Sequence, residues 1–132
     1  MRSAGQALIE TGLCLPVLLG LGLGAAATIR VADARAGLDA ACSAAVATAA
    51  RAPDPAGAVG SATARFQAVA GEYPLRAPSL RLDTGAFERG GLATCDASAT
   101  VDLSFAPLPG RLSSVRLASH AGSRIDDWRS RH

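Results

Sequence analysis

The sequence lacks lysine and asparagine, and it has few aromatic residues: three phenylalanines, one tyrosine and one tryptophan among 132 residues. All thirteen basic residues counted as Lys or Arg are therefore arginines, and eleven carboxylates leave a formal net charge of only +2. This charge is weak and evenly spread, with none of the basic patches that are typical of nucleic-acid binding. We therefore expect no nucleic-acid partner.

The sequence also lacks the common motifs of metal sites and enzymes. Three cysteines are present, but there is no CxxC pair and no cluster of cysteine with histidine, so we expect neither a metal site nor a cofactor. His120 is expected on the solvent face of a strand, without a nucleophile to activate. Asp126 and Asp127 are neighbours, and on a strand neighbours point to opposite faces. We therefore expect that the chain is not an enzyme.

Charge is absent from Thr11 to Ile29. At about 1.5 Å per residue this stretch is roughly 28 Å long, close to the thickness of the hydrocarbon core of a bilayer. It predicts one transmembrane helix. Arg2 lies on the short side and favours an N-terminus in the cytoplasm and a C-terminal part outside it, in a single-pass protein of the cytoplasmic membrane.

Small residues recur at every fourth position within this stretch: Gly12, Pro16, Gly20 and Gly24. Such spacing allows a second helix to approach closely in lipid. Alternatively, the spacing reflects no more than the abundance of glycine in the span. Pro16 is expected to kink or loosen the helix locally.

The helical pattern continues beyond the apolar stretch, so that one helix is predicted from about Gln6 to Ala52. Its second half has an apolar stripe at helical spacing, formed by Leu38, Cys42, Ala45, Val46 and Ala49. A second, short helix is predicted with Asp54 as N-cap, Pro55 in the first turn and Gly71 as its stop. Its buried face is predicted to contain Val59, Ala62, Phe66 and Val69.

After Pro74 the pattern becomes alternating, and it predicts three strands in an antiparallel sheet. The strands contain Leu80 and Leu82, then Ala93–Phe105, then Val115–Ile125. Glu88–Gly91 is expected to be a turn, and 107–110 a break. The predicted fold is thus α+β, with the stripe of the long helix covering the apolar face of the sheet.

Cys42 lies on the helix stripe and Cys95 on the apolar face of the central strand. The two could form a disulfide, which would close a loop of about 50 residues and add about 4 kcal/mol to stability in the chain-entropy model. The alternative is a pair of buried free thiols.

The N-terminal sequence Gly5-Gln6-Ala7-Leu8-Ile9-Glu10, followed by an apolar helix with a Leu15-Pro16 step, resembles the start of a type IV prepilin. It is most similar to a TadE-like pseudopilin, a minor pilin of the tight-adherence (Flp) pilus system. The resemblance implies a pilin-like fold and cleavage by a membrane prepilin peptidase after Gly5. The mature chain would then begin at Gln6, with Glu10 as its fifth residue. Thr11 departs from the tyrosine that follows the glutamate in major Flp pilins, which favours a pseudopilin.

The resemblance also implies a division of the chain into a leader at 1–5, a transmembrane helix at 6–29, an extracytoplasmic continuation at 30–52 and a small exported α+β domain at 53–132. The implied partners are other pilins or pseudopilins and the pilus assembly platform, contacted through the N-terminal helix, together with the prepilin peptidase and the lipid bilayer. The implied function is assembly of the pilus or of a related secretion apparatus.

A carboxylate at the edge of an apolar helix is costly in lipid and normally has a partner. The new amino group at Gln6 of a neighbouring subunit could pair with Glu10 and set the register between subunits. Alternatively, Glu10 is solvated among lipid headgroups.

Two other functions remain open. Ala25-Ala26-Ala27 has the small-x-small pattern of a Sec signal-peptide cut, which would release a secreted domain. A lipoprotein cut is disfavoured because Leu13 precedes Cys14. The chain could also be an uncleaved single-span protein that carries a small binding domain unrelated to pili.

Overall fold

The computed structural model describes residues 3–85, 87–88, 90–105 and 113–125. In chain order these residues form helices α1 (Ala4–Arg51) and α2 (Pro55–Ala70) and strands β1 (Arg76–Asp83), β2 (Leu92–Asp102) and β3 (Ser114–Arg124). The long helix, the short helix and the three-stranded antiparallel sheet confirm the predicted α+β layout. Residues 107–110, where a break was predicted, and the Asp126-Asp127 pair lie outside the described residues.

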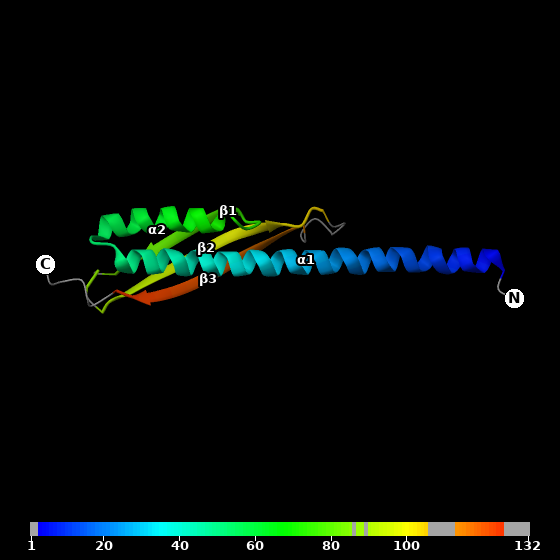
Figure 1. The fold of residues 1–132 in the computed structure, drawn as a ribbon, viewed down its shortest axis with the longest axis horizontal. Coiled ribbons are helices and arrows are strands. Elements are labelled where there is room, and N and C mark those ends of the chain that lie inside the picture. The colour runs from blue at the N-terminus through cyan, green and yellow to red at the C-terminus, as the bar shows by residue number, and fades with distance from the viewer. Residues whose placement is uncertain (1–2, 86, 89, 106–112, 126–132) are drawn as a thin grey trace.

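Helix α1 has 48 residues, which corresponds to a length of roughly 72 Å. The side chain of Ser3 caps its start by accepting a hydrogen bond from the Gln6 N–H at 3.4 Å. Pro16 lies inside the helix but does not interrupt it. As a result α1 projects as a single rod far beyond the rest of the protein (Figure 1).

Helix α2 packs beside the second half of α1 (Figure 1). Its start is as predicted, because Asp54 accepts a hydrogen bond from the Gly57 N–H at 3.1 Å and Pro55 is the first helical residue. Gly71 ends the helix in a right-handed conformation, with φ −66°.

The predicted buried face of α2 is confirmed at Ala62 and Phe66 and wrong at Val59 and Val69, each of which is replaced by a neighbouring alanine. Its fully buried positions are Ala58, Ala62, Phe66 and Ala70. Val59 is instead 47% exposed, and Val69 is only partly buried. Three of the four buried residues are alanines, whose small side chains let the axes of two helices approach closely. Close packing against α1 therefore selects the alanine row over the valines.

The strands have the order β1-β2-β3, and both pairs are antiparallel. The central strand is shorter than predicted, because β2 ends at Asp102. The Asp102 carboxylate accepts a hydrogen bond from the Ser104 N–H at 2.9 Å, which turns the chain out of the sheet. Leu103 is still buried, but Phe105 is 44% exposed and does not continue the inward face.

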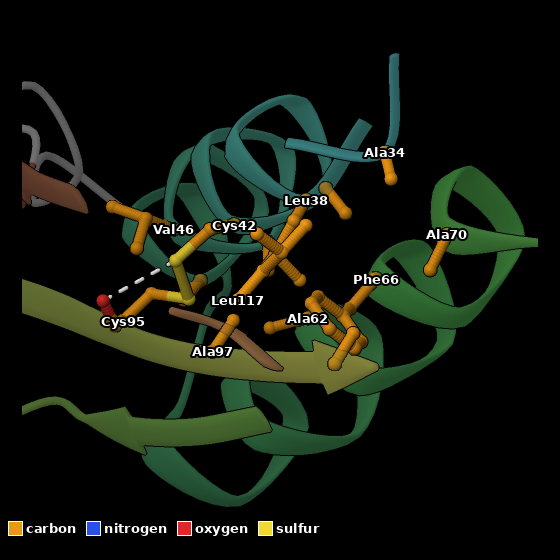
Figure 2. Packing of buried hydrophobic residues seen from close by; sticks show 14 of the residues in the cluster. Ala34, Leu38, Cys42, Val46, Ala62, Phe66, Ala70, Cys95, Ala97 and Leu117 are labelled. Atoms are coloured by element: carbon orange, nitrogen blue, oxygen red, sulfur yellow. Dashed lines mark hydrogen bonds between the residues drawn. A yellow bond between two sulfur atoms is a disulfide. The ribbon is translucent and has the colours of Figure 1, made fainter. Parts of the chain in front are cut away.

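Both helices lie against one face of the sheet, and the core fills the space between them (Figures 1 and 2). All members of the predicted α1 stripe are buried, and they meet inward residues of β2 and β3 such as Ala97 and Leu117. The other face carries polar side chains in register, including Arg81, Asp96 and His120. The long helix therefore has one half inside this core and one half outside it.

Candidate functional site

The candidate site is the first half of α1, whose apolar side chains are not covered by the described part of the chain. An 18-residue window of this helix has a mean hydropathy of 2.0, and none of its residues is buried. Leu13 and Leu21, for example, are each 68% exposed. This helix is long and apolar enough to span a membrane.

The predicted packing residues lie on this exposed half. A Cβ atom added to Gly12, Gly20 or Gly24 would meet no atom within 4 Å, so the space beside these glycines is open. A row of residues four apart winds slowly about a helix, since four residues turn it slightly more than once. Such a row suits a neighbouring helix that crosses at an angle.

Glu10 lies two residues before Gly12 and is exposed. It lines a shallow groove of about 250 Å³ together with Thr11, Cys14, Leu15 and Leu18. The carboxylate is thus at the edge of an apolar surface, as the sequence predicted. Cys14, in the same groove, is an exposed free cysteine.

The predicted processing residues lie in the first turn of α1. Both Gly5 and Gln6 are helical and exposed, and the Gln6 N–H is held by the Ser3 cap. A peptidase binds extended backbone, so cleavage between them requires this first turn to open. This turn opens at low cost because it contains a glycine and because it lies at the end of the helix.

The buried half of α1 contains a close contact that sequence reasoning missed. A Cβ atom at Gly37 would lie 2.2 Å from a ring carbon of Tyr73, so only glycine fits between the helix and this ring. The glycines of α1 therefore have different surroundings. The Tyr73 ring fills the space beside Gly37, whereas the space beside Gly20 is open.

Cys42 of α1 and Cys95 of β2 form a disulfide in the structure, with their Cα atoms 5.8 Å apart and both residues fully buried (Figure 2). The bond closes a loop between residues 53 positions apart. It joins the buried half of α1 covalently to the central strand.

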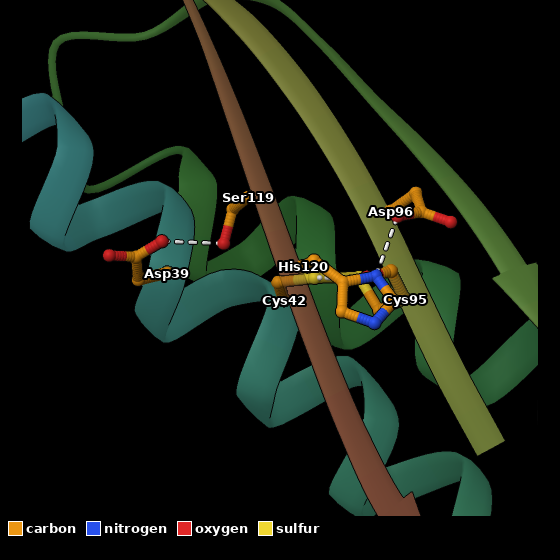
Figure 3. Close-up of polar contacts among 6 residues, drawn as sticks. All are labelled: Asp39, Cys42, Cys95, Asp96, Ser119 and His120. Atoms are coloured by element: carbon orange, nitrogen blue, oxygen red, sulfur yellow. Dashed lines mark hydrogen bonds and ion pairs between the residues drawn. A yellow bond between two sulfur atoms is a disulfide. The ribbon is translucent and has the colours of Figure 1, made fainter. Parts of the chain in front are cut away.

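Two polar contacts flank this disulfide (Figure 3). Ser119 of β3 donates a hydrogen bond to Asp39 of α1 at 2.5 Å. On the outer face, His120 Nδ1 lies 2.7 Å from Asp96 Oδ1, and both side chains are mostly exposed. These contacts link α1 to β3 and β3 to β2. Within the described ranges, no group of three or more His, Cys, Asp or Glu residues is arranged to hold a metal ion.

The end of the sheet nearest the exposed half of α1 brings together residues that sequence reasoning did not connect. The Arg30 guanidinium lies 5.6 Å from the centre of the Phe105 ring, within the range of a cation–π contact. Nearby, hydrogen bonds from the backbone and side chain of Ser104 lower the pKa of Asp102 below its ordinary value of 3.8, and Arg76 at 3.3 Å contributes a smaller effect. The alternating pattern of the sequence predicted Phe105 only as the last residue of the central strand and gave no sign of its contact with Arg30.

Comparison with known proteins adds no family assignment: no protein-family model, curated protein or solved structure matches this chain.

Proposed function

We propose that the chain is a TadE-like pseudopilin, a membrane-anchored minor component that helps assemble a tight-adherence (Flp) pilus or a related secretion apparatus. The observation that carries the proposal is a single continuous helix with one apolar half exposed and the other half built into a small α+β domain. Such a helix can hold the domain at a membrane before assembly and pack against other helices afterwards. The N-terminal resemblance to prepilins supplies the specific family.

The disulfide supports an extracytoplasmic location for the domain. Disulfides persist in oxidising compartments and are rare in the cytoplasm. Cys42 and Cys95 lie beyond the apolar half of α1, on the side that the proposal places outside the cell membrane. The topology then has an N-terminus in the cytoplasm and one membrane crossing.

In this proposal the subunits assemble through the exposed half of α1. Cleavage after Gly5 would create a cationic amino group at Gln6, and Glu10 of a neighbour would pair with it. In a low-dielectric environment this pair is far stronger than in water, so it would fix the axial register of the two helices. The open spaces beside Gly12, Gly20 and Gly24 would let the helices approach closely.

The processing step is tested by determining the amino terminus of the mature protein, isolated from cells that carry a prepilin peptidase. A chain that begins at Gln6 supports the proposal. A chain that begins at Thr28 identifies a secreted domain released by a Sec signal cut. An intact Met1 identifies an uncleaved membrane anchor. Either of the last two results would overturn the pseudopilin assignment.

The assembly step is tested with Glu10→Gln, which removes the charge but keeps the size of the side chain. We expect this variant to enter the membrane but to lose co-purification with its pilin partners. Glu72→Gln, a matched change at an exposed carboxylate of the domain, should leave co-purification intact. Wild-type co-purification of the Glu10→Gln variant would contradict the register role of the Glu10 charge.

A further inference from the structure

The exposed half of α1 is not the only apolar surface that faces away from the core. Three segments meet at the end of the sheet where β2 stops: the turn of α1 around Ile29, Pro74 after α2, and Leu103–Phe105 after β2. We call these residues the tip. Phe105 is 44% exposed and Ile29 is 62% exposed, although both are large and apolar.

The tip overlaps the end of the apolar stretch. Ala27 and Val31 of α1 are partly buried because they pack against the core, yet Ala27 lies within the charge-free residues 11–29. A membrane crossing needs about 20 residues. The charge-free stretch is no longer than that, so all of its helical turns are needed to cross the bilayer. If the stretch spans the bilayer, the tip cannot stand above the membrane surface. It must lie where the hydrocarbon core meets the headgroups.

Two grooves, one on each side of α1, have the chemical character expected at this depth in a membrane. One, of about 480 Å³, is lined by Ala26, Ile29, Arg30, Asp33, Pro74 and Phe105. The other, of about 380 Å³, is lined by Ala27, Thr28, Val31, Ala32, Arg35 and Leu103. Each groove has an apolar floor and one arginine at its border, and it continues the apolar surface of the helix. An acyl chain fits the floor, and a lipid phosphate fits the arginine.

The charges around the tip agree with a phospholipid contact. Arg30 lies over the ring of Phe105, and segments that lie in the membrane interface combine arginine with apolar side chains such as phenylalanine. Among the described residues, carboxylates also lie near the tip. Asp102 is paired with Arg76 at 3.3 Å, whereas Asp33 borders the same groove as Arg30. Among the described residues that line the two grooves, two arginines, Arg30 and Arg35, are thus available to lipid phosphates against one carboxylate, Asp33.

We infer that the tip is a second membrane contact, in which Phe105 and the two grooves seat in the headgroup and upper acyl region of a phospholipid bilayer. This inference rests on the proposed membrane anchor. The contact would give the domain a fixed height and tilt on the membrane before assembly. It would also explain why an aromatic side chain beside Arg30 is left exposed.

The test uses the full chain in phosphatidylcholine vesicles with tryptophan as a depth probe. Trp128 is the only tryptophan, so Trp128→Phe provides a background for single probes. Phe105→Trp places a probe at the tip, and Ser104→Trp provides a second one in case the first does not fold. Leu18→Trp reports the centre of the apolar stretch. Val59→Trp reports the exposed side of α2, since Val59 is 47% exposed.

We expect lipids brominated near the headgroup end of their chains to quench Phe105→Trp, and its emission to be shifted to the blue. Leu18→Trp should be quenched best by lipids brominated near the chain ends, and Val59→Trp should not be quenched. A quenched Leu18→Trp with unquenched tip probes would overturn the tip contact and leave the anchor standing. An unquenched Leu18→Trp would overturn both the anchor and the tip contact. Quenching of Val59→Trp as strongly as Phe105→Trp would overturn a contact specific to the tip.

Discussion

The two halves of α1 are made of similar residues but have opposite surroundings. Leu18 is 64% exposed, whereas Leu38 is fully buried. A Cβ at Gly20 would meet open space, whereas one at Gly37 would collide with Tyr73. Alanine, leucine and glycine thus occur on both sides of the boundary, and the domain covers only one side.

This difference shows that composition does not tell which part of an apolar helix is the core of its own domain. In the second half, apolar residues form a stripe, and exposed positions such as Asp39 carry charge. In the first half, all sides of the helix carry large apolar side chains. This pattern is expected only when the helix is surrounded by lipid or by other helices. The comparison therefore predicts opposite responses to matched substitutions in the two halves.

The largest expected difference concerns the cysteines. Cys42→Ala should lower the free energy of unfolding by about 4 kcal/mol, because it removes a cross-link between residues 53 positions apart. Cys14→Ala, in the exposed half, should change it by less than about 0.5 kcal/mol. Urea unfolding of the detergent-solubilised chains measures both effects. Mass spectrometry without reduction should also show a linked peptide with Cys42 and Cys95, and free alkylation of both thiols in denaturant would contradict the bond.

Next in size is the pair Leu38→Ala and Leu18→Ala. The first leaves a cavity in the core and should cost about 2–5 kcal/mol of unfolding free energy. The second removes the same atoms from a side chain that is 64% exposed and should cost less than about 0.5 kcal/mol. Urea unfolding of the detergent-solubilised chains again measures both costs. Equal costs would show that the first half of α1 packs against its own domain in solution.

Glycine provides a smaller contrast. Gly37→Ala forces the Tyr73 ring to move and should destabilise the domain by about 1–3 kcal/mol. Gly20→Ala should not destabilise it, because alanine is the better helix former by about 1 kcal/mol. Co-purification with the proposed pilin partners should respond in the reverse way: Gly20→Leu should lose these partners and keep the wild-type urea midpoint. Loss of partners without a stability change at Gly20 would sharpen the division of α1 into an assembly half and a core half.

The smallest effect is the acid sensitivity of the domain. Because the folded state lowers the pKa of Asp102, this carboxylate adds stability above its ordinary pKa of 3.8, and the contribution is lost as the pH falls through the folded-state pKa. Asp102→Asn should therefore lose less stability than the wild type between about pH 5 and pH 2. Arg76→Gln should show a partial effect. Urea midpoints measured across this range test it, and parallel curves for Asp102→Asn and wild type would contradict the assignment.

Much of the fold could be predicted because local rules and burial agree. The cap of α2 at Asp54, the stripe of α1 and the alternation of β2 each follow from a pattern within a few residues. The errors occurred where tertiary contacts decide. The choice of Ala58 over Val59 depends on how closely α2 approaches α1, and the end of β2 depends on a hydrogen bond of the Asp102 side chain.

The candidate site divides in the same way. The apolar span could be predicted, because length and hydropathy are local properties. The contact of Gly37 with Tyr73 and that of Arg30 with Phe105 could not, because each joins segments far apart in the chain. The processing residues Gly5 and Gln6 and the role of Glu10 stay predictions, since they concern a peptidase and neighbouring subunits.

The position of the disulfide has a mechanical consequence. If the first half of α1 is held by neighbouring subunits, as proposed, and the domain is pulled away, force enters the domain where α1 first meets the core, at Ala27 and Val31. The helix can then peel from the sheet only as far as Cys42, where the load passes through a covalent bond into the central strand. The part of α1 beyond Cys42, including Ala45 and Ala49 of its buried stripe, is then shielded from tension. Under a reducing agent the same pull would strip the helix from the sheet completely.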